Sequence, residues 1–263
     1  MNQNIKNSII ILTRDRKKLL NQCLNSLYKN ISFTEFEIIL IDNGSRDDNT
    51  RFLKRHKAVK FIKLPHNIGV SAGRNIGVSN TQGKYIIFLD DDTIVEDDPF
   101  FKITKFMDKN KEIGIVGPKL LYSNNKIQES IRKFPTPLSV FWRGTFLGKI
   151  LPNMSFYKDH LLRDFNHKEI KEVDWVLGAC QIIRKEVFNA IGYLDEKYFY
   201  GYEDIDFCYR AKNAGWKIVY YPYSKIIHYY RRESAKRFIS KNKIDHVKGI
   251  IRFFYKKYFK IGL

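Results

Sequence analysis

Three consecutive aspartates, Asp90, Asp91 and Asp92, directly follow the apolar run "YIIFL". Successive side chains of an extended strand point to opposite sides, so Asp90 and Asp92 project together while Asp91 projects the other way. Two carboxylates on one side suit a hard divalent cation such as Mg²⁺ or Mn²⁺, which would also relieve their mutual repulsion. Taken alone, the triplet favours a different interpretation, a solvated acidic turn that leads into a helix near Asp98.

A second group of acids, Glu203, Asp204 and Asp206, lies in the segment "YEDIDFCYRAKNAG", which is predicted to be a helix that stops at Gly215. Helix dipoles favour acids in a first turn, and Asp206 is spaced to pair with Arg210 four residues later, so a purely structural role fits all three acids. The spacing alone therefore favours this structural role.

The elements that would position these acids alternate between strands and helices. Apolar runs at residues 8–13, 36–42, 59–64, 84–90 and 113–117 are predicted strands, and helical segments separate them. This alternation predicts an α/β fold with a mostly parallel, twisted sheet that is flanked by helices on both faces. Ligands of such sheets bind beyond the carboxyl ends of the strands, where the second and the fourth strand both end in aspartate.

The intervening helices are expected at residues 47–57, from the glycine-rich segment "NIGVSAGRNIG" to about Gly83, and from Asp98 or Pro99 onward. Residues 123–171 contain several prolines and no regular apolar pattern. We interpret them as a variable insertion or a loop on the acceptor side of the site.

The charge balance is strongly basic, with 47 Lys and Arg against 28 Asp and Glu and a formal net charge of +19. Such a chain attracts polyanions, phosphorylated ligands or an anionic membrane surface. Its three cysteines form no C-x-x-C pair, which indicates neither a disulfide framework nor a zinc site and favours the reduced cytosol. No apolar run reaches the roughly 20 residues of a bilayer span, and charges at residues 14–16 interrupt the first one. We therefore expect a cytoplasmic protein, either soluble or peripheral at the inner face of the cell membrane.

Six motifs in a fixed order resemble the family 2 glycosyltransferases, which have the GT-A type of α/β fold. They are "ILTRDR", "IDNGSRDDNT", "NIGVSAGRNIG", "FLDDDT", then "VDWVLGACQIIRKEVF" with "GYEDIDFCYRAKNAGW", and finally "IIH". The pattern is most similar to the rhamnosyltransferase-like branch that builds bacterial surface polysaccharides. The resemblance implies a glycosyltransferase domain at residues 1–230, in which residues 1–122 bind the nucleotide sugar and residues 123–230 bind the acceptor.

The resemblance also implies roles for individual residues. The nucleotide-sugar contacts would be Thr13, Arg14, Asp42, Asn67, Gly69, Arg74, Asp90 and Asp91; the ligands of Mn²⁺ or Mg²⁺ would be Asp92, Asp90 and His228; the acceptor side would include Glu203, Trp175 and Gly178. Asp204 would be the general base of an inverting transfer to a glycan or lipid-linked hydroxyl. Each role has a structural alternative: Arg74 as a solvated charge, Trp175 as a core residue, and His228 as a structural histidine.

The donor is expected to be a UDP- or dTDP-linked sugar, because the carboxylate of Asp42 can accept the imide N–H of uracil or thymine. Arg74 stands where the rhamnosyltransferase-like branch often has Asn, and this departure favours uridine diphosphate.

The remaining segment, residues 231–263, is predicted to be a basic aromatic helical tail. Its helical stripes are Val247, Ile250, Ile251, Phe254 and Tyr258 on one side, and Lys248, Arg252, Lys256 and Lys260 on another. A basic amphipathic helix of this kind suits an anionic membrane surface. The alternative is a helix that packs back on the domain with a solvated charged face.

Two other function classes fit part of this pattern. A nucleotidyltransferase shares the fold and the aspartate–metal chemistry, but it would need a glycine-rich loop for the triphosphate, which "ILTRDRKK" lacks. A non-enzymatic polyanion-binding protein would explain the net charge. No nucleic-acid-binding motif is present, however, and acids at the edge of the sheet would repel a polyanion, so no nucleic-acid partner is expected.

Overall fold

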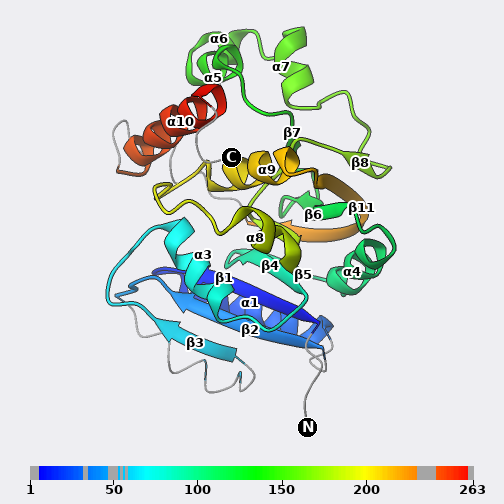
Figure 1. The fold of residues 1–263 in the computed structure, drawn as a ribbon. Helices are drawn as coiled ribbons and strands as arrows, with labels where there is room; N and C mark the ends of the chain where they lie inside the picture. Colours follow the sequence, from blue (N-terminus) through cyan, green and yellow to red (C-terminus); the bar gives the residue numbers. More distant parts are fainter. Residues whose placement is uncertain are drawn as a thin grey trace.

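The computed structural model describes residues 6–31, 35–46, 53, 56, 59–229 and 241–259. A nine-stranded sheet runs through the molecule, and helices cover both of its faces (Figure 1). The first half supplies four parallel strands in the order β3-β2-β1-β4. They are β1 (Asn7–Thr13), β2 (Phe36–Asp42), β3 (Val59–Lys63) and β4 (Tyr85–Asp90).

Strand β1 shows why this sheet is covered twice. Ile9 and Ile11 belong to the core on one face, Ile10 belongs to the core on the other face, and all three are buried. A strand that is apolar on both sides must bury both, which requires two layers of helices. Helices α1 (Lys17–Asn30) and α4 (Pro99–Lys109) cover one face; α3 (Val70–Ser79), α8 (Lys185–Ile191) and α9 (Glu203–Asn213) cover the other.

The second half continues the same sheet with mixed directions. Strand β10 (Cys180–Arg184) lies antiparallel between β4 and β6 (Ile113–Leu121), and β11 (Lys217–His228) pairs parallel with β6. Short strands β5 (Thr93–Val95) and β8 (Lys171–Glu172) pair with β11, while β7 (Ile131–Arg132) and β9 (Trp175–Val176) form a separate pair. Because β10 adjoins β4, the loop before β10 lies beside the aspartates that follow β4.

The GT-A type of α/β fold that the motifs imply is confirmed, with local differences. The helix in the glycine-rich segment ends at Ser79, four residues before Gly83. The segment 123–171 is more ordered than expected, because it contains the helices α5 (Pro137–Gly144), α6 (Leu147–Ile150) and α7 (Ser155–His160). A capping box formed by Thr136 and Ser139 starts α5. This local signal for a helix start was missed because the apolar residues around it follow no regular pattern. The helix expected at residues 47–57 lies largely outside the described residues.

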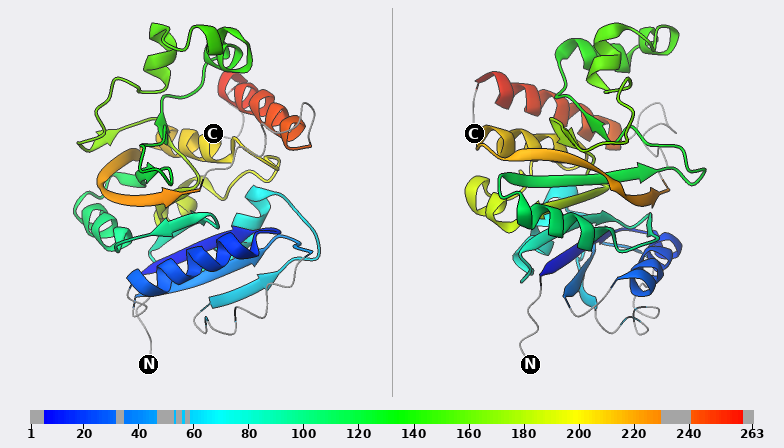
Figure 2. Two further views of the ribbon diagram at one scale, coloured as in Figure 1. Left: turned by 180° about the vertical axis from the view of Figure 1, so that it is seen from behind. Right: turned by 90° about the vertical axis from the view of Figure 1, so that its right-hand side faces the viewer.

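The C-terminal helix α10 (Lys241–Phe259) packs on the domain, beside α9 and α5 in both Figures 1 and 2. The face that packs only partly matches the predicted apolar stripe, because Ile250 and Phe254 of that stripe contact the core. Phe253 is fully buried, and Lys256 on the same face pairs with Asp195 and Asp206, at 3.3 and 2.6 Å. The buried Asp206 and the partly buried Asp195 therefore attract this side of the helix, while Val247, Ile251 and Tyr258 are left exposed. Lys260 lies outside the described residues.

Within the described part of the chain, no helix is long and apolar enough to cross a membrane.

Candidate active site

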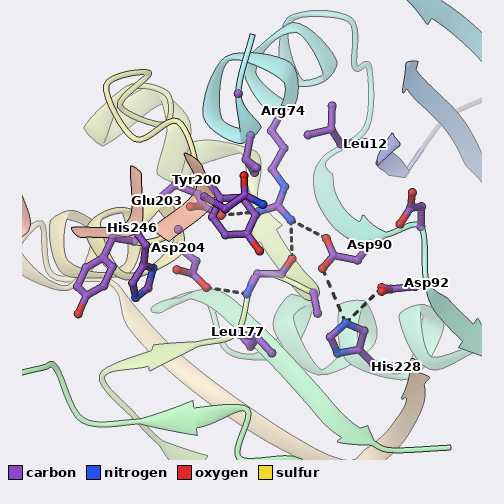
Figure 3. A pocket seen from close by; sticks show the side chains of 18 of the residues that line it. Leu12, Arg74, Asp90, Asp92, Leu177, Tyr200, Glu203, Asp204, His228 and His246 are labelled. Atoms are coloured by element: carbon purple, nitrogen blue, oxygen red, sulfur yellow. Dashed lines mark hydrogen bonds and ion pairs between the residues drawn. The ribbon is translucent and has the colours of Figure 1, made fainter. Parts of the chain in front are cut away.

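A cleft of about 640 Å³ opens at the carboxyl ends of β1 and β4 (Figure 3). The loop 177–179, the start of α9, the end of β11 and two residues of α10 also line it. Its volume is in the range of small-molecule sites. The acids that the sequence singled out in two distant motifs, Asp90 to Asp92 and Glu203 with Asp204, meet in this one cleft.

Asp90, Asp92 and His228 form a group that could hold a metal ion. Their ligand atoms all lie within 4.8 Å of one another, and Nε2 of His228 is 3.2 Å from Oδ1 of Asp92 and 4.0 Å from Oδ2 of Asp90. The buried Oδ1 of Asp92 accepts no hydrogen bond from the described residues. Two carboxylates and an imidazole with an unused oxygen between them fit a divalent cation.

Gln128 determines which nitrogen of His228 faces this group. The amide nitrogen of Gln128 donates to the carbonyl oxygens of Leu121 and His228, at 3.2 and 2.8 Å. Its amide oxygen therefore faces Nδ1 of His228, 3.0 Å away, and accepts a hydrogen bond from it. In the neutral imidazole, Nε2 is then left with the lone pair that a metal ligand needs, and the hydrogen bond at Nδ1 fixes the orientation of the ring.

Asp91 points away from this group, as expected for alternate residues of a strand end. Its carboxylate accepts a hydrogen bond from the Thr13 hydroxyl at 2.6 Å and pairs with Arg16 at 3.2 Å. The same Arg16 nitrogen lies 3.1 Å from Asp92. Burial raises the pKa of Asp91 to about 7, although Arg16 and Thr13 oppose the shift. Negative charge is thus unfavourable in this crowded acid cluster, and Arg16 offsets part of it.

The carboxylate of Asp204 is held at the opposite side of the cleft. Oδ2 accepts a hydrogen bond from the backbone N–H of Gly178 at 3.0 Å, and Oδ1 accepts one from the N–H of Ile205 at 2.9 Å. Burial raises the pKa of Asp204, although these N–H groups and Arg74 oppose the shift. A Cβ at residue 178 would lie 2.9 Å from Arg74 Nη1, so glycine permits this close approach. An oriented carboxylate with a raised pKa has the properties of a general base.

Arg74 connects the two sides of the cleft, as Figure 3 shows. It donates to Asp90 Oδ1 at 2.9 Å and to the carbonyl of Gly178 at 2.8 Å, and its other nitrogen lies 3.7 Å from Glu203. The side chain is buried rather than solvated. Nη2 is thus directed at the protein, whereas the buried Nη1 makes no hydrogen bond with the described residues. A positioning role between the acid groups and direct contact with the nucleotide both stay predictions.

Glu203 is buried next to Asp204 and close to Arg74. Burial, and next the charge of Asp204, raise the pKa of Glu203 to about 7. The two adjacent carboxylates therefore share a site in which full ionisation of both is unfavourable.

The residues expected at the nucleotide end occupy the loops after β1, β2 and β3. Arg14 lines the cleft, and so does Asn67, whose side chain accepts hydrogen bonds from Asn43 and from the N–H of Gly69, both at 3.0 Å. Gly69 has φ +93° and caps α3. Asp42 is fully buried and accepts a hydrogen bond from the N–H of Ser45, so Asn43 rather than Asp42 lines the cleft.

The part of the cleft where an acceptor is expected, which we call the acceptor end, is basic and aromatic. Trp175 lines it but is largely buried, and Arg132 stacks over its ring at 5.4 Å. Arg143 of α5 and His246 of α10 also line this end. Burial, followed by the Arg143 charge, lowers the pKa of His246, which favours a neutral ring at neutral pH.

Sequence reasoning missed Arg16, Gln128, Arg132, Arg143 and His246. Arg16 belongs to the motif "ILTRDR", so that motif carried a signal for it. The other four lie in the irregular segment or the tail, where no pattern distinguishes them.

The sheet and its two layers of helices have the GT-A type of fold, and the cleft at the carboxyl ends of β1 and β4 gathers acids from two distant motifs. The sequence model of glycosyl transferase family 2 matches residues 8–192, and the chain belongs to that family.

Among curated relatives, the rhamnosyltransferase WbbL of Escherichia coli is 27% identical over 95% of this chain and 92% of its own length. The N-acetylglucosaminyl-diphospho-decaprenol L-rhamnosyltransferase of Mycobacterium tuberculosis is 24% identical over 73% of this chain and 66% of its own length. The matches to four other curated relatives cover between 18% and 57% of the lengths of those relatives.

Two solved structures show a similar fold. GalNAc-T7 with UDP, GalNAc and Mn²⁺ matches with a TM-score of 0.70 at 18% identity, over 97% of this chain and 48% of that one. TarS 1–349 of S. aureus, in complex with UDP-GlcNAc, matches with a TM-score of 0.67 at 19% identity, over 96% and 66%.

Proposed function

We propose that this protein is an inverting, metal-dependent glycosyltransferase of polysaccharide or cell-envelope biosynthesis. It transfers a sugar from a UDP- or dTDP-linked donor to a hydroxyl group of a glycan or lipid-linked acceptor, at the cytoplasmic face of the membrane. One observation carries the proposal: Asp204, a backbone-oriented carboxylate, faces the same cleft as Asp90, Asp92 and His228, and Arg74 links the two groups.

The donor would be held by residues 1–122, with its diphosphate near the Asp90, Asp92 and His228 group. A Mn²⁺ or Mg²⁺ ion bound by these three residues would neutralise the charge that develops on the diphosphate. The mutual distances of the ligand atoms, the unused oxygen of Asp92 and the lone pair directed by Gln128 support this assignment. The Mn²⁺ and UDP of the GalNAc-T7 structure agree with it.

Asp204 would accept the proton of the acceptor hydroxyl while the oxygen of that hydroxyl bonds to the anomeric carbon of the donor sugar. The bond from that carbon to the diphosphate oxygen breaks in the same displacement. Because the attacking and leaving groups are on opposite faces of the sugar, the anomeric configuration is inverted. Glu203 lies beside the base and is proposed to hydrogen-bond the acceptor.

The acceptor is proposed to bind residues 123–230 and to carry phosphate. Arg132 and Arg143 line the acceptor end, and guanidinium groups suit phosphate oxygens. The diphospho-decaprenol in the name of the mycobacterial relative supports an acceptor of this kind.

The test is transfer from a panel of UDP- and dTDP-sugars to a short-chain lipid diphosphate sugar, followed by NMR of the anomeric configuration. Asp204→Asn should reduce turnover by about 10²–10⁴ while nucleotide binding is retained. The exposed Asp97 provides the control, because Asp97→Asn should leave turnover unchanged. Near-normal turnover by the Asp204 variant, or retention of configuration, would rule out the proposed mechanism.

A further inference from the structure

The outward face of α10 carries large apolar and aromatic side chains at helical spacing. They are Ile244, Val247, Ile251, Tyr255, Tyr258 and Phe259, each between 49% and 67% exposed. The intervals of three and four residues place them along one stripe of the helix. The opposite face, which includes Gly249, Phe253 and Lys256, packs on the domain, so the exposed stripe is not needed to attach the helix.

A second exposed apolar segment adjoins this stripe. It is formed by Leu138, Phe141, Phe146, Ile150, Leu151 and Met154, each between 40% and 67% exposed. This segment contains α5 and α6, which lie beside α10 in all views of Figures 1 and 2. Lys257 of α10 donates to the carbonyl of Pro135, 3.2 Å away, and Phe134 contacts Phe253. The two segments therefore form one region, which we call the apolar rim.

The charges of the rim are almost all positive. Residues 137–154 contain Arg143 and Lys149 and no acid, and α10 contains a single acid, Asp245, which lies 3.8 Å from Lys248. The side chain of Lys248 is 72% exposed. Apolar and aromatic side chains among exposed cations, with almost no acids, match an anionic bilayer surface.

The positive charge of the rim also favours a bilayer over a second copy of the chain as its binding partner. Two copies that met through their rims would bring cations against cations on a protein whose net charge is already +19. An anionic bilayer would instead neutralise them. We infer that this protein docks on an anionic lipid bilayer through the apolar rim, with the stripe of α10 inserted at the level of the headgroups.

Docking in this way would set the acceptor end of the cleft at the membrane surface. Asn242 and His246 of α10 and Arg143 of α5 line that end of the cleft, so the rim and the cleft share two helices. A bilayer held against the rim is adjacent to the place where a lipid-linked acceptor would enter. Binding to the bilayer itself requires neither donor nor metal, and it can be tested apart from catalysis.

The test is co-sedimentation with vesicles of phosphatidylcholine alone and of phosphatidylcholine mixed with phosphatidylglycerol. The full-length chain should bind the mixed vesicles and should bind less as salt is raised, because the Debye length falls from about 10 Å at 0.1 M to 3 Å at 1 M. The double variant Ile251→Glu, Tyr255→Glu should bind at least about tenfold more weakly, because two charges would enter the headgroup layer. Both side chains are exposed, so thermal unfolding should be unchanged.

Phe101→Glu is the matched control, because Phe101 is 52% exposed on α4, away from the rim. This variant should bind like the unmodified chain. Unchanged binding by the double variant would overturn the proposal, and so would a failure of the unmodified chain to bind anionic vesicles. A concentration-dependent dimer that the double variant loses, without vesicle binding, would identify a second copy as the occupant and would also overturn it. If the protein still binds vesicles in chelator but no longer transfers sugar, docking on the bilayer is independent of the proposed catalysis.

Discussion

Asp92→Ala should remove the stabilisation that a divalent cation gives to this protein. Asp92 is buried beside His228, and its Oδ1 is unused in the hydrogen bonding of the described residues. A ligand that binds only the folded state at one hundred times its Kd stabilises by about 2.7 kcal/mol. With about 2.1 cal/mol/K of unfolding entropy per residue, the 263 residues give about 0.55 kcal/mol/K, so Tm should rise by about 5 °C.

The loss in the variant can be estimated in the same way. If removal of the Asp92 carboxylate weakens binding about a hundredfold, the same cation concentration equals the new Kd. The stabilisation then falls to about 0.4 kcal/mol and the shift to less than about 1 °C.

The assay is thermal unfolding in chelator and in Mn²⁺, each with and without UDP. Glu96→Ala is the control, because Glu96 is an exposed acid close in sequence, and its variant should keep the full shift. The reasoning is refuted if the Asp92 variant keeps a shift of about 5 °C, or if the unmodified protein shows no shift even with UDP.

Three further predictions concern residues around the cleft. The pKa of Glu203 is raised to about 7 by burial and by its acidic neighbour, so the folded state binds the extra proton and stability should fall as pH rises from about 4.5 through 7. The measurement is urea unfolding in chelator at pH 5 and at pH 8. Glu203→Gln should reduce the difference in unfolding free energy between the two pH values by up to about 3 kcal/mol, and an unchanged difference would contradict the prediction. Gln128→Leu should weaken Mn²⁺ affinity by about 10- to 100-fold in titration calorimetry, whereas Gln82→Leu, on an exposed turn, should not. Lys256→Met should destabilise the protein by about 1–3 kcal/mol, because the buried Asp206 loses one of its two cationic partners and keeps only Arg210. The exposed Lys248→Met should cost less than about 0.5 kcal/mol, and equal effects would refute the buried pairing.

The sequence predicted the parallel half of the fold well, because each strand there is a separate apolar run followed by helical spacing. It also placed the acids at one edge, since parallel strands present their carboxyl ends together. Asp206 pairs with Arg210 as its spacing indicates, at 2.9 Å. These features depend on local pattern and on the strand directions that the alternation requires.

The features that local pattern could not predict arise from contacts between distant segments. The antiparallel insertion of β10 brings Gly178 between Arg74 and Asp204, 104 and 26 positions away, and no periodicity encodes that contact. Asp195 and Asp206, which lie outside α10, help to determine which face of that helix is buried, because both pair with Lys256. A helix with both an apolar and a basic stripe has two possible contact faces, and only the partner surface decides between them.

The hydrogen bond between Gln128 and His228 has a practical consequence for chimeric enzymes. Gln128 lies near the start of the segment whose side chains line the acceptor end, yet its amide orients a ring 100 positions away at the other end of the cleft. Under the proposed function, a graft that replaces residues 123–171 from a relative should alter acceptor preference, and it would also remove the hydrogen bond that orients this ring. A graft that begins at residue 131 would exchange the residues expected to contact the acceptor and would keep the hydrogen bond between Gln128 and His228. The junction of such a chimera therefore belongs between Ser130 and Ile131.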